Sequence, residues 1–269
     1  MVRPTLAPLL FLAAACAGGT TTSSTGGAVA PSAAAPADGE AVLRLMHDRY
    51  AGKWYKTLTF RQQTTRTTPS GETRHETWYE ASLLPGKLRI DIAPVDSGNA
   101  ILFLGDSAIT FRRGQRAAAR QDRNLLMTLG FDVYGQPVDS SVAQLRAEGT
   151  DLSKVHDGVW QGRPVWIVGA SEGDTTATQF WVEKDRLLFV RLIQQLPPNP
   201  NQPNAPAPLL DVVFDKYQPL AGGWIAPDVI IRVNGREVQR EIYDEIHANV
   251  PLEPGLFDAT AYRRPGWVK

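Results

Sequence analysis

The sequence predicts a mainly β (α+β) protein whose folded part, residues 40–269, is one curled antiparallel sheet of about eleven strands. Two observations predict this fold. Short segments rich in β-branched and aromatic residues recur along the chain, and turn-forming residues separate most of them without crossover helices. Successive strands connected in this way form a single antiparallel sheet most simply. No internal repeat and no second linker follow residue 40, so one domain is the simpler prediction.

The N-terminus has the three-part pattern of an export signal. Arg3 gives a positive start, residues 6–15 are apolar apart from Pro8, and three alanines precede Cys16. The apolar run is too short to span a bilayer, which takes about 20 residues. The pattern predicts a lipoprotein signal peptide over residues 1–15. An ordinary signal peptide, with Cys16 incidental, is the alternative.

Residues 12–16, LAAAC, resemble the bacterial lipobox, which implies that the Cys16 thiol receives a diacylglyceryl group. Lipid on Cys16 would attach the protein to a membrane, since each buried CH₂ contributes about 0.8 kcal/mol. The same resemblance implies a location in the bacterial cell envelope, at the outer membrane and facing the periplasm, because Ala17 stands where lipoproteins retained at the inner membrane have an aspartate. Gly, Ser, Thr, Ala and Pro dominate residues 16–39, so the lipidated cysteine is predicted to begin a flexible linker.

The first part of the domain is predicted to be one helix followed by five strands. Apolar residues at helical spacing over 40–51 predict an amphipathic helix, with Asp38 as a possible N-cap. Residues 87–92 alternate apolar and charged side chains, which is typical of a half-buried strand. Gly105-Asp106 predicts a tight hairpin. The strands are expected at 55–67, 72–84, 87–92, 100–104 and 107–112.

Two short helices are predicted next, followed by about six further strands. The helices are expected at 124–131 and 140–148, where the period of the apolar residues changes. Asn234-Gly235 is a strong hairpin signal between the last two strands. The strands are expected at 158–170, 176–183, 187–196, 209–217, 224–233 and 237–248.

Charge and motifs argue against several classes of function. The chain has 28 basic and 28 acidic residues, so no electrostatic case exists for binding nucleic acid. Its four histidines are far apart and form no metal-ligand pair, so neither a metal nor a cofactor is predicted. No nucleotide-binding loop and no G-x-S-x-G motif occurs, and the protein is not predicted to be an enzyme. A basic run is interpreted as a solvated loop or, less often, as a contact with lipid phosphate. It contains Arg112, Arg113, Arg116, Arg120 and Arg123.

Several short motifs resemble a known family. They are residues 84–91 (LPGKLRID), 104–107 (LGDS) and 249–252 (NVPL). Together with the order of elements, they resemble the outer-membrane lipoprotein carrier and receptor (Lol) family and its lipoprotein-sorting relatives. The resemblance covers residues 40–260 and implies a half-barrel, with helices over the open side of a strongly curved sheet. The soluble carrier has an arginine before the turn proline that helps hold the lid, and this chain has Leu84 there instead.

The resemblance also implies an apolar cavity that receives acyl chains. The expected function is a lipid-anchored periplasmic protein that binds the acyl chains of lipids or lipoproteins and helps to sort them. A non-catalytic envelope sensor or interaction module, with an envelope protein as partner, is the alternative. Taken one at a time, each candidate lining residue fits ordinary core better than a cavity wall, although the large rings of Trp78, Trp166 and Trp181 suit acyl-chain pockets. The candidates are Leu58, Phe60, Trp78, Leu88, Ile90, Phe103, Phe111, Trp166, Phe180, Trp181, Phe189, Phe214, Val229 and Ile231.

Overall fold

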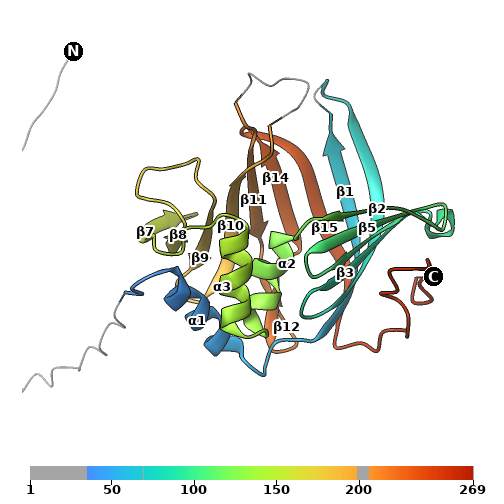
Figure 1. Cartoon of the computed structure of the whole chain (residues 1–269), viewed down its shortest axis with the longest axis horizontal. Helices are drawn as coiled ribbons and strands as arrows, with labels where there is room; N and C mark the ends of the chain where they lie inside the picture. The colour runs from blue at the N-terminus through green and yellow to red at the C-terminus, as the bar shows by residue number, and fades with distance from the viewer. Residues whose placement is uncertain (1–34, 69, 199–205, 269) are drawn as a thin grey trace, which may run out of the picture. The chain divides into compact units, whose positions relative to one another are not determined.

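A computed structural model of the chain describes residues 35–68, 70–198 and 206–268 (Figure 1). The chain divides into two units, Met1–Ala35 and Pro36–Lys269, and the fold described below is that of the second unit. The predicted signal peptide, Cys16 and most of the linker lie outside the described residues.

The second unit is built on one antiparallel sheet of 13 strands, where about eleven were expected, and it curls without closing, as the resemblance to half-barrel proteins implies. The strand order is β6-β5-β4-β3-β2-β1-β15-β14-β11-β10-β9-β8-β7, and β12 and β13 form a separate pair. The first and last long strands of the domain, β1 and β15, therefore pair at the middle of the sheet. The strands are β1 Thr57–Thr67, β2 Thr73–Leu83, β3 Lys87–Ile92, β4 Ala100–Leu104, β5 Ser107–Arg112, β6 Gln115–Gln121, β7 Val155–Trp160, β8 Arg163–Val168, β9 Gln179–Glu183, β10 Leu188–Gln195, β11 Leu209–Asp215, β12 Gln218–Leu220, β13 Gly223–Ile225, β14 Asp228–Val233 and β15 Arg236–Ala248.

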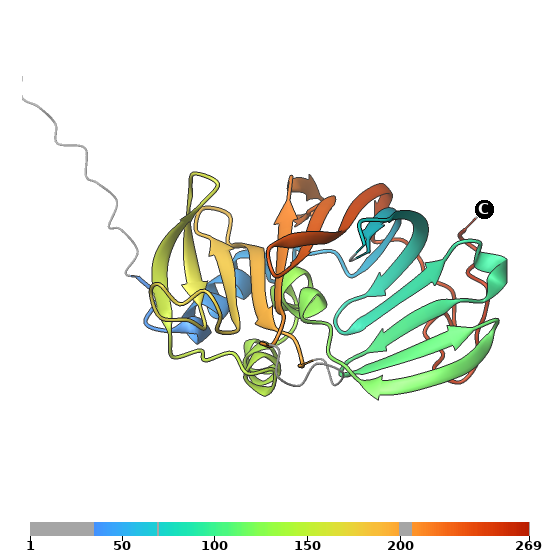
Figure 2. The ribbon, with the colours of Figure 1, turned by 90° about the horizontal axis from the view of Figure 1, so that it is seen from above.

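The helices gather on one face of the sheet, here called the inner face (Figures 1 and 2). The Asp38 side chain accepts a hydrogen bond from the Ala41 N–H at 2.8 Å, which confirms it as the N-cap of α1. Within the described residues, no helix is both long and apolar enough to cross a membrane. The helices are α1 Gly39–Tyr50, α2 Leu125–Gly130 and α3 Val138–Ala147, with 3₁₀ turns η1 Val95–Ser97 and η2 Asp132–Tyr134.

The structure corrects three of the predicted elements. The strand expected at 224–233 is divided into β13, which pairs with β12 outside the main sheet, and β14, which pairs with β11 and β15 within it. The single strand expected at 158–170 is a hairpin of β7 and β8, which turns at Gln161-Gly162, where both residues have positive φ. The basic run is not a loop, because six of the seven residues of Gln115–Gln121 pair with β5, and this segment forms the exposed edge strand β6. Arg113 and Gly114, both with positive φ, make the turn that returns the chain into β6.

The sheet is also buried on its outer face over β3 to β5. The alternation in β3 predicts that Arg89 and Asp91 face water, but they are 4% and 1% exposed. Arg89 donates to the backbone oxygens of Leu256 and Arg263 in the C-terminal segment, and Tyr262 of that segment packs near Phe111. Figure 2 shows this segment along the outer side of these strands. The two faces of this half of the sheet are therefore closed differently, one by helices and one by the C-terminal segment.

Candidate functional site

A cavity of about 80 Å³, here called the inner cavity, lies between α2 and the inner face of the sheet. Its walls come from β1, β2, β3, β11 and β15, and α2 with its flanking residues closes it. Most of its lining is apolar or aromatic. The lining residues are Phe60, Trp78, Glu80, Ser82, Leu88, Ile90, Asn124, Leu126, Met127, Phe131, Phe214, Glu241 and Tyr243.

Local geometry explains why α2 sits so close to the sheet. The Asn124 side chain caps the helix by accepting from the Leu126 N–H at 3.0 Å. At the other end, a Cβ on Gly130 would lie 2.7 Å from the Phe214 ring, so only glycine allows this approach. The close contact directs Leu126 and Met127 into the inner cavity. The helix therefore fills much of the space that the curved sheet would otherwise leave open.

A second hollow, here called the mouth cleft, adjoins the inner cavity and has a volume of about 360 Å³. Phe131 lines both hollows and so forms part of the wall between them. Trp54 also lines the mouth cleft and is 7% exposed, and its indole N–H has no hydrogen-bond partner in the described part of the chain. The other lining residues are Gly52, Tyr55, Lys56, Leu84, Pro85, Asp132, Tyr134, Gly135 and Gln136.

Asp132 connects the helical cover to the β2–β3 turn. Its carboxylate oxygen accepts a hydrogen bond from the Gly86 N–H at 3.0 Å. Burial raises the pKa of Asp132 to about 6, although the Gly86 hydrogen bond and the nearby Arg123 guanidinium oppose the shift. Leu84 lies at the edge of this turn and lines the mouth cleft. The Asp132 carboxyl group of η2 therefore holds the helical cover at the β2–β3 turn. The position before Pro85, where the soluble carrier has an arginine, is Leu84 in this chain.

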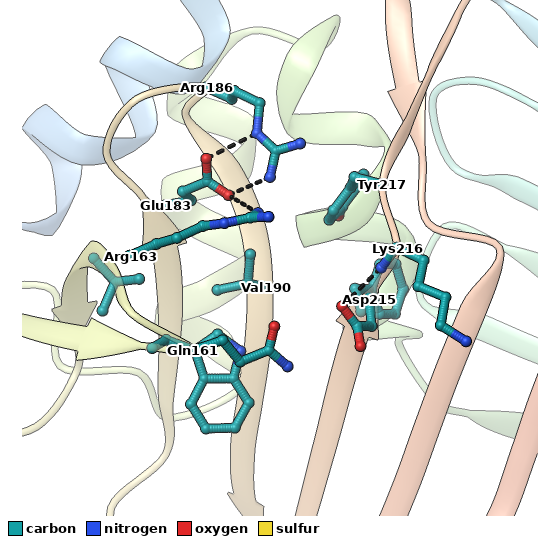
Figure 3. A pocket seen from close by; sticks show the side chains of 11 residues that line it. Gln161, Arg163, Glu183, Arg186, Val190, Asp215, Lys216 and Tyr217 are labelled. Carbon is teal, nitrogen blue, oxygen red and sulfur yellow. Dashed lines mark hydrogen bonds and ion pairs between the residues drawn. The ribbon is translucent and has the colours of Figure 1, made fainter.

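A third hollow of about 230 Å³, here called the outer cleft, lies beside β8 to β11 and is shown in Figure 3. Its most buried charge is Glu183, which is 3% exposed and accepts hydrogen bonds from Arg163 and Arg186 at 2.9 and 2.8 Å. Burial alone would raise the pKa of Glu183, but these arginines outweigh it, and the pKa lies below its usual value. The Tyr217 hydroxyl donates to the Phe189 backbone oxygen at 2.6 Å. These polar groups are therefore paired within the protein itself.

The structure brings together five of the fourteen candidate lining residues at the inner cavity. These are Phe60, Trp78, Leu88, Ile90 and Phe214. Seven more lie in the same core cluster without lining that cavity, either buried or partly buried. They are Leu58, Phe103, Trp166, Phe180, Phe189, Val229 and Ile231.

Phe111 and Trp181 lie away from the inner cavity. Phe111 packs with Leu102 and Ile109 on the outer face, under the C-terminal segment. Trp181 belongs to another outer cluster and packs edge-on against Trp160 at 5.4 Å. Phe111 lies on β5 and Trp181 lies on β9. Each of these strands carries apolar side chains on both faces, so the sequence does not show which face is the inner one.

Sequence reasoning missed the polar part of the cavity wall. Glu80, Ser82 and Glu241 line the inner cavity and are 5%, 1% and 8% exposed. A signal was available for two of them, because Trp78, Glu80 and Ser82 alternate along one strand and must share a face. Glu241 gave no such signal, since only the pairing of β1 with β15 brings it to the same wall.

No protein-family model matches the chain, and no curated protein matches it either. Solved structures do match its fold. A domain assigned as an outer membrane lipoprotein-sorting protein from Vibrio parahaemolyticus has a TM-score of 0.52 and 12% identity, over 81% of this chain and 95% of that chain. A DUF1329 family protein from Desulfovibrio piger has a TM-score of 0.51 and 12% identity, over 82% of this chain and 95% of that chain.

At these identities the comparisons concern the fold alone. The two matches cover 81% and 82% of this chain and 95% of each of the other chains, so they extend over most of the described unit. The fold expected from the sequence resemblance is therefore confirmed. The chain has the open half-barrel fold found in outer membrane lipoprotein-sorting proteins.

Proposed function

We propose that the half-barrel binds an acyl chain of a lipid or lipoprotein, and that the protein serves lipid or lipoprotein sorting at the outer membrane. The observation that carries this proposal is the inner cavity, an apolar hollow between a short helix and a curved sheet. The role is binding rather than catalysis. The predicted lipid on Cys16 and the predicted linker would keep the domain within reach of a membrane.

The inner cavity is too small for a whole chain in the structure described above. Its volume of about 80 Å³ is well below the roughly 300–1,000 Å³ of typical ligand pockets. A chain that enters through the mouth cleft must therefore displace Phe131 and shift α2. The helix can move in this way because α2 has only six residues, and helices shorter than about 12 residues owe their stability to packing.

The energetics favour such an exchange. An acyl chain that replaces Leu126, Met127 and Phe131 against the sheet would keep the apolar surface of the cavity covered. Each CH₂ group buried contributes about 0.8 kcal/mol, so ten of them contribute about 8 kcal/mol before the cost of moving the helix. If moving the helix costs about 3 kcal/mol, about 5 kcal/mol remains, which corresponds to a Kd of roughly 0.2 mM.

A binding assay with cavity-filling variants tests the proposal. A fluorescent acyl ester, which has no free carboxylate, would be titrated into the full chain carrying Cys16→Ser. Ile90→Trp fills the inner cavity, and Ile109→Trp is the matched control, since Ile109 is equally buried but lies on the outer face. We expect binding by the parent chain and by Ile109→Trp, and loss of binding in Ile90→Trp. Circular dichroism would verify that both variants fold.

Two results would reject the proposal. One is the absence of any probe binding to the parent chain. The other is unchanged binding in a folded Ile90→Trp variant, because an occupied cavity cannot also hold a chain.

A second function, as an interaction module, is favoured by the edge strand β6. All seven of its residues are exposed, and its outer edge pairs with no strand among the described residues. A free sheet edge of this kind can accept an extended segment of a partner protein. A stable complex with an envelope protein that persists in Ile90→Trp but not after Ala118→Pro in β6 would support this second function instead.

A further inference from the structure

The inner cavity has two buried polar groups that the protein leaves without partners. Glu80 and Ser82 both point from β2 toward the cavity and are 5% and 1% exposed. The Ser82 hydroxyl has no hydrogen-bond partner, and no hydrogen bond to the Glu80 carboxyl is found within residues 35–68, 70–198 and 206–268. Buried polar groups in folded proteins are nearly always hydrogen-bonded, so this pair calls for an explanation.

A second carboxyl group makes the wall more specific. Glu241 lines the same cavity and accepts hydrogen bonds from the Tyr243 hydroxyl at 2.8 Å and from the Gln239 amide at 2.5 Å. Burial, and then the charge of Glu241, raise the pKa of Glu80 well above its ordinary value. Glu80 is therefore held in its protonated form, in which a carboxyl group both donates and accepts hydrogen bonds.

These groups restrict what the cavity can hold. In the free protein the space is large enough for a few water molecules, each of which needs only about 10–15 Å³ and two or more polar partners. A plain hydrocarbon chain would expel that water and leave Glu80 and Ser82 unpaired, which would weaken binding about tenfold or more for each group. A carboxylate placed there would have to give up its water in a buried site beside Glu241, and burial disfavours a charged group.

We propose that the inner cavity selects an acyl chain carrying an uncharged hydrogen-bonding group, such as an ester, over a free fatty acid, with Glu80 and Ser82 binding that group. The inference rests on the proposed function, since it assumes that a chain enters this cavity. It adds the class of ligand: a neutral acyl ester or amide, whose carbonyl accepts from Glu80 and Ser82.

The test compares three probes with one chain length: 1-lauroyl glycerol, laurate and dodecylamine. Each would compete with a fluorescent lipid for the full chain carrying Cys16→Ser, at pH 7.5. We expect 1-lauroyl glycerol to bind at least about tenfold more tightly than laurate, because the neutral ester can accept from Glu80 and Ser82 without the cost of burying a charge. Equal affinities, or tightest binding of laurate or of dodecylamine, would overturn the inference.

Variants assign the effect to the two side chains. Glu80→Leu should weaken 1-lauroyl glycerol about tenfold without weakening laurate, whereas Glu80→Gln should keep the preference because an amide still donates and accepts. Glu72→Leu is the control, since Glu72 is exposed just before β2. Ser82→Ala removes a single oxygen and carries the same test if Glu80→Leu does not fold. A preference that survives both Glu80→Leu and Ser82→Ala would refute the assignment.

The outcomes separate this inference from the proposed function. If none of the three probes binds the parent chain, the proposed function is rejected and the inference is rejected with it. If the probes bind but do so equally, the cavity is a general acyl-chain site and only the inference is rejected.

Discussion

The carboxyl group of Asp132 should make the stability of the domain depend on pH in a defined direction. Asp132 is 4% exposed, and burial raises its pKa from 3.8 to about 6. Because the pKa is higher in the folded state, the folded protein binds the proton more tightly than the unfolded chain. The contribution of this group to stability is therefore complete below pH 3.8 and is lost as the pH rises through 6.

The magnitude follows from the size of the shift. A difference of about 2.2 pKa units corresponds to about 3 kcal/mol, at 1.36 kcal/mol for each unit. Asp132→Asn removes the titration but keeps a side-chain oxygen that can accept from the Gly86 N–H. The variant should therefore match the parent chain near pH 4 and be more stable than it by up to about 3 kcal/mol at pH 8.

Urea unfolding, followed by tryptophan fluorescence at several pH values between 4 and 8, measures this difference. The difference in the free energy of unfolding between Asp132→Asn and the parent chain is the relevant quantity, because the titration of all other groups cancels in it. Asp139→Asn serves as the control, since Asp139 is an exposed carboxylate on the neighbouring helix α3. Comparison with this variant separates the effect of a buried carboxyl group from the effect of removing any one carboxylate.

Two outcomes would refute the reasoning. A difference that stays within about 1 kcal/mol over the whole range would mean that Asp132 is not buried in solution and that the cover is not closed over the β2–β3 turn. A difference of the opposite sign would mean that the Gly86 hydrogen bond and Arg123 outweigh burial.

Three further predictions concern the C-terminal segment, one turn and the anchor. Arg89→Ala should lower the free energy of unfolding in urea by about 3–5 kcal/mol, because it leaves the buried Asp91 charge unpaired. Adding Asp91→Ala should recover part of that loss. A loss below about 1 kcal/mol would show that the C-terminal segment is not packed against Arg89. Gly169→Ala should lower the free energy of unfolding by at least about 2 kcal/mol, since φ of Gly169 is +105° and the new Cβ would lie 2.4 Å from the Thr178 backbone oxygen. Gly52→Ala is the control, because the space around Gly52 is open, and it should lower the free energy of unfolding by less. Equal losses in the two variants would contradict the steric reason. Cys16→Ser should move the protein from the membrane to the soluble fraction, and a variant that remains in the membrane would exclude lipid on this residue as the attachment.

The hairpins show how much of the fold can be predicted from the sequence. Gly105-Asp106 and Asn234-Gly235 occur at the β4–β5 and β14–β15 turns, and β3 has the predicted bounds. These features depend on residues next to one another in the chain, where turn chemistry acts directly. The β7–β8 turn was missed because Gln161-Gly162 is a weaker signal than Asn-Gly, although its backbone takes up the same positive φ values.

The faces of the strands could not be predicted in the same way. Leu102 and Phe103 are neighbours on β4, yet one packs outward and the other packs against the inner core. Arg89 has the pattern of a solvent-facing residue, and only a segment more than 160 residues further along the chain buries it. The cover over each face is formed by distant parts of the chain, so burial on both faces leaves no periodic signal.

The inner cavity has two walls, the sheet and α2, and different kinds of contact hold each of them in place. The sheet side is fixed by ladders of hydrogen bonds from β3 through β1 to β15, and over β3 the C-terminal segment supports it from behind. The α2 side depends on packing, on its Asn124 cap and on the Asp132 contact to Gly86. A ligand that enters must therefore displace helix rather than sheet, and it replaces apolar contacts that stabilise the closed form. Binding and closure then compete for the same surface, so a variant that loosens α2 without altering the sheet should bind a chain more tightly while it unfolds more easily.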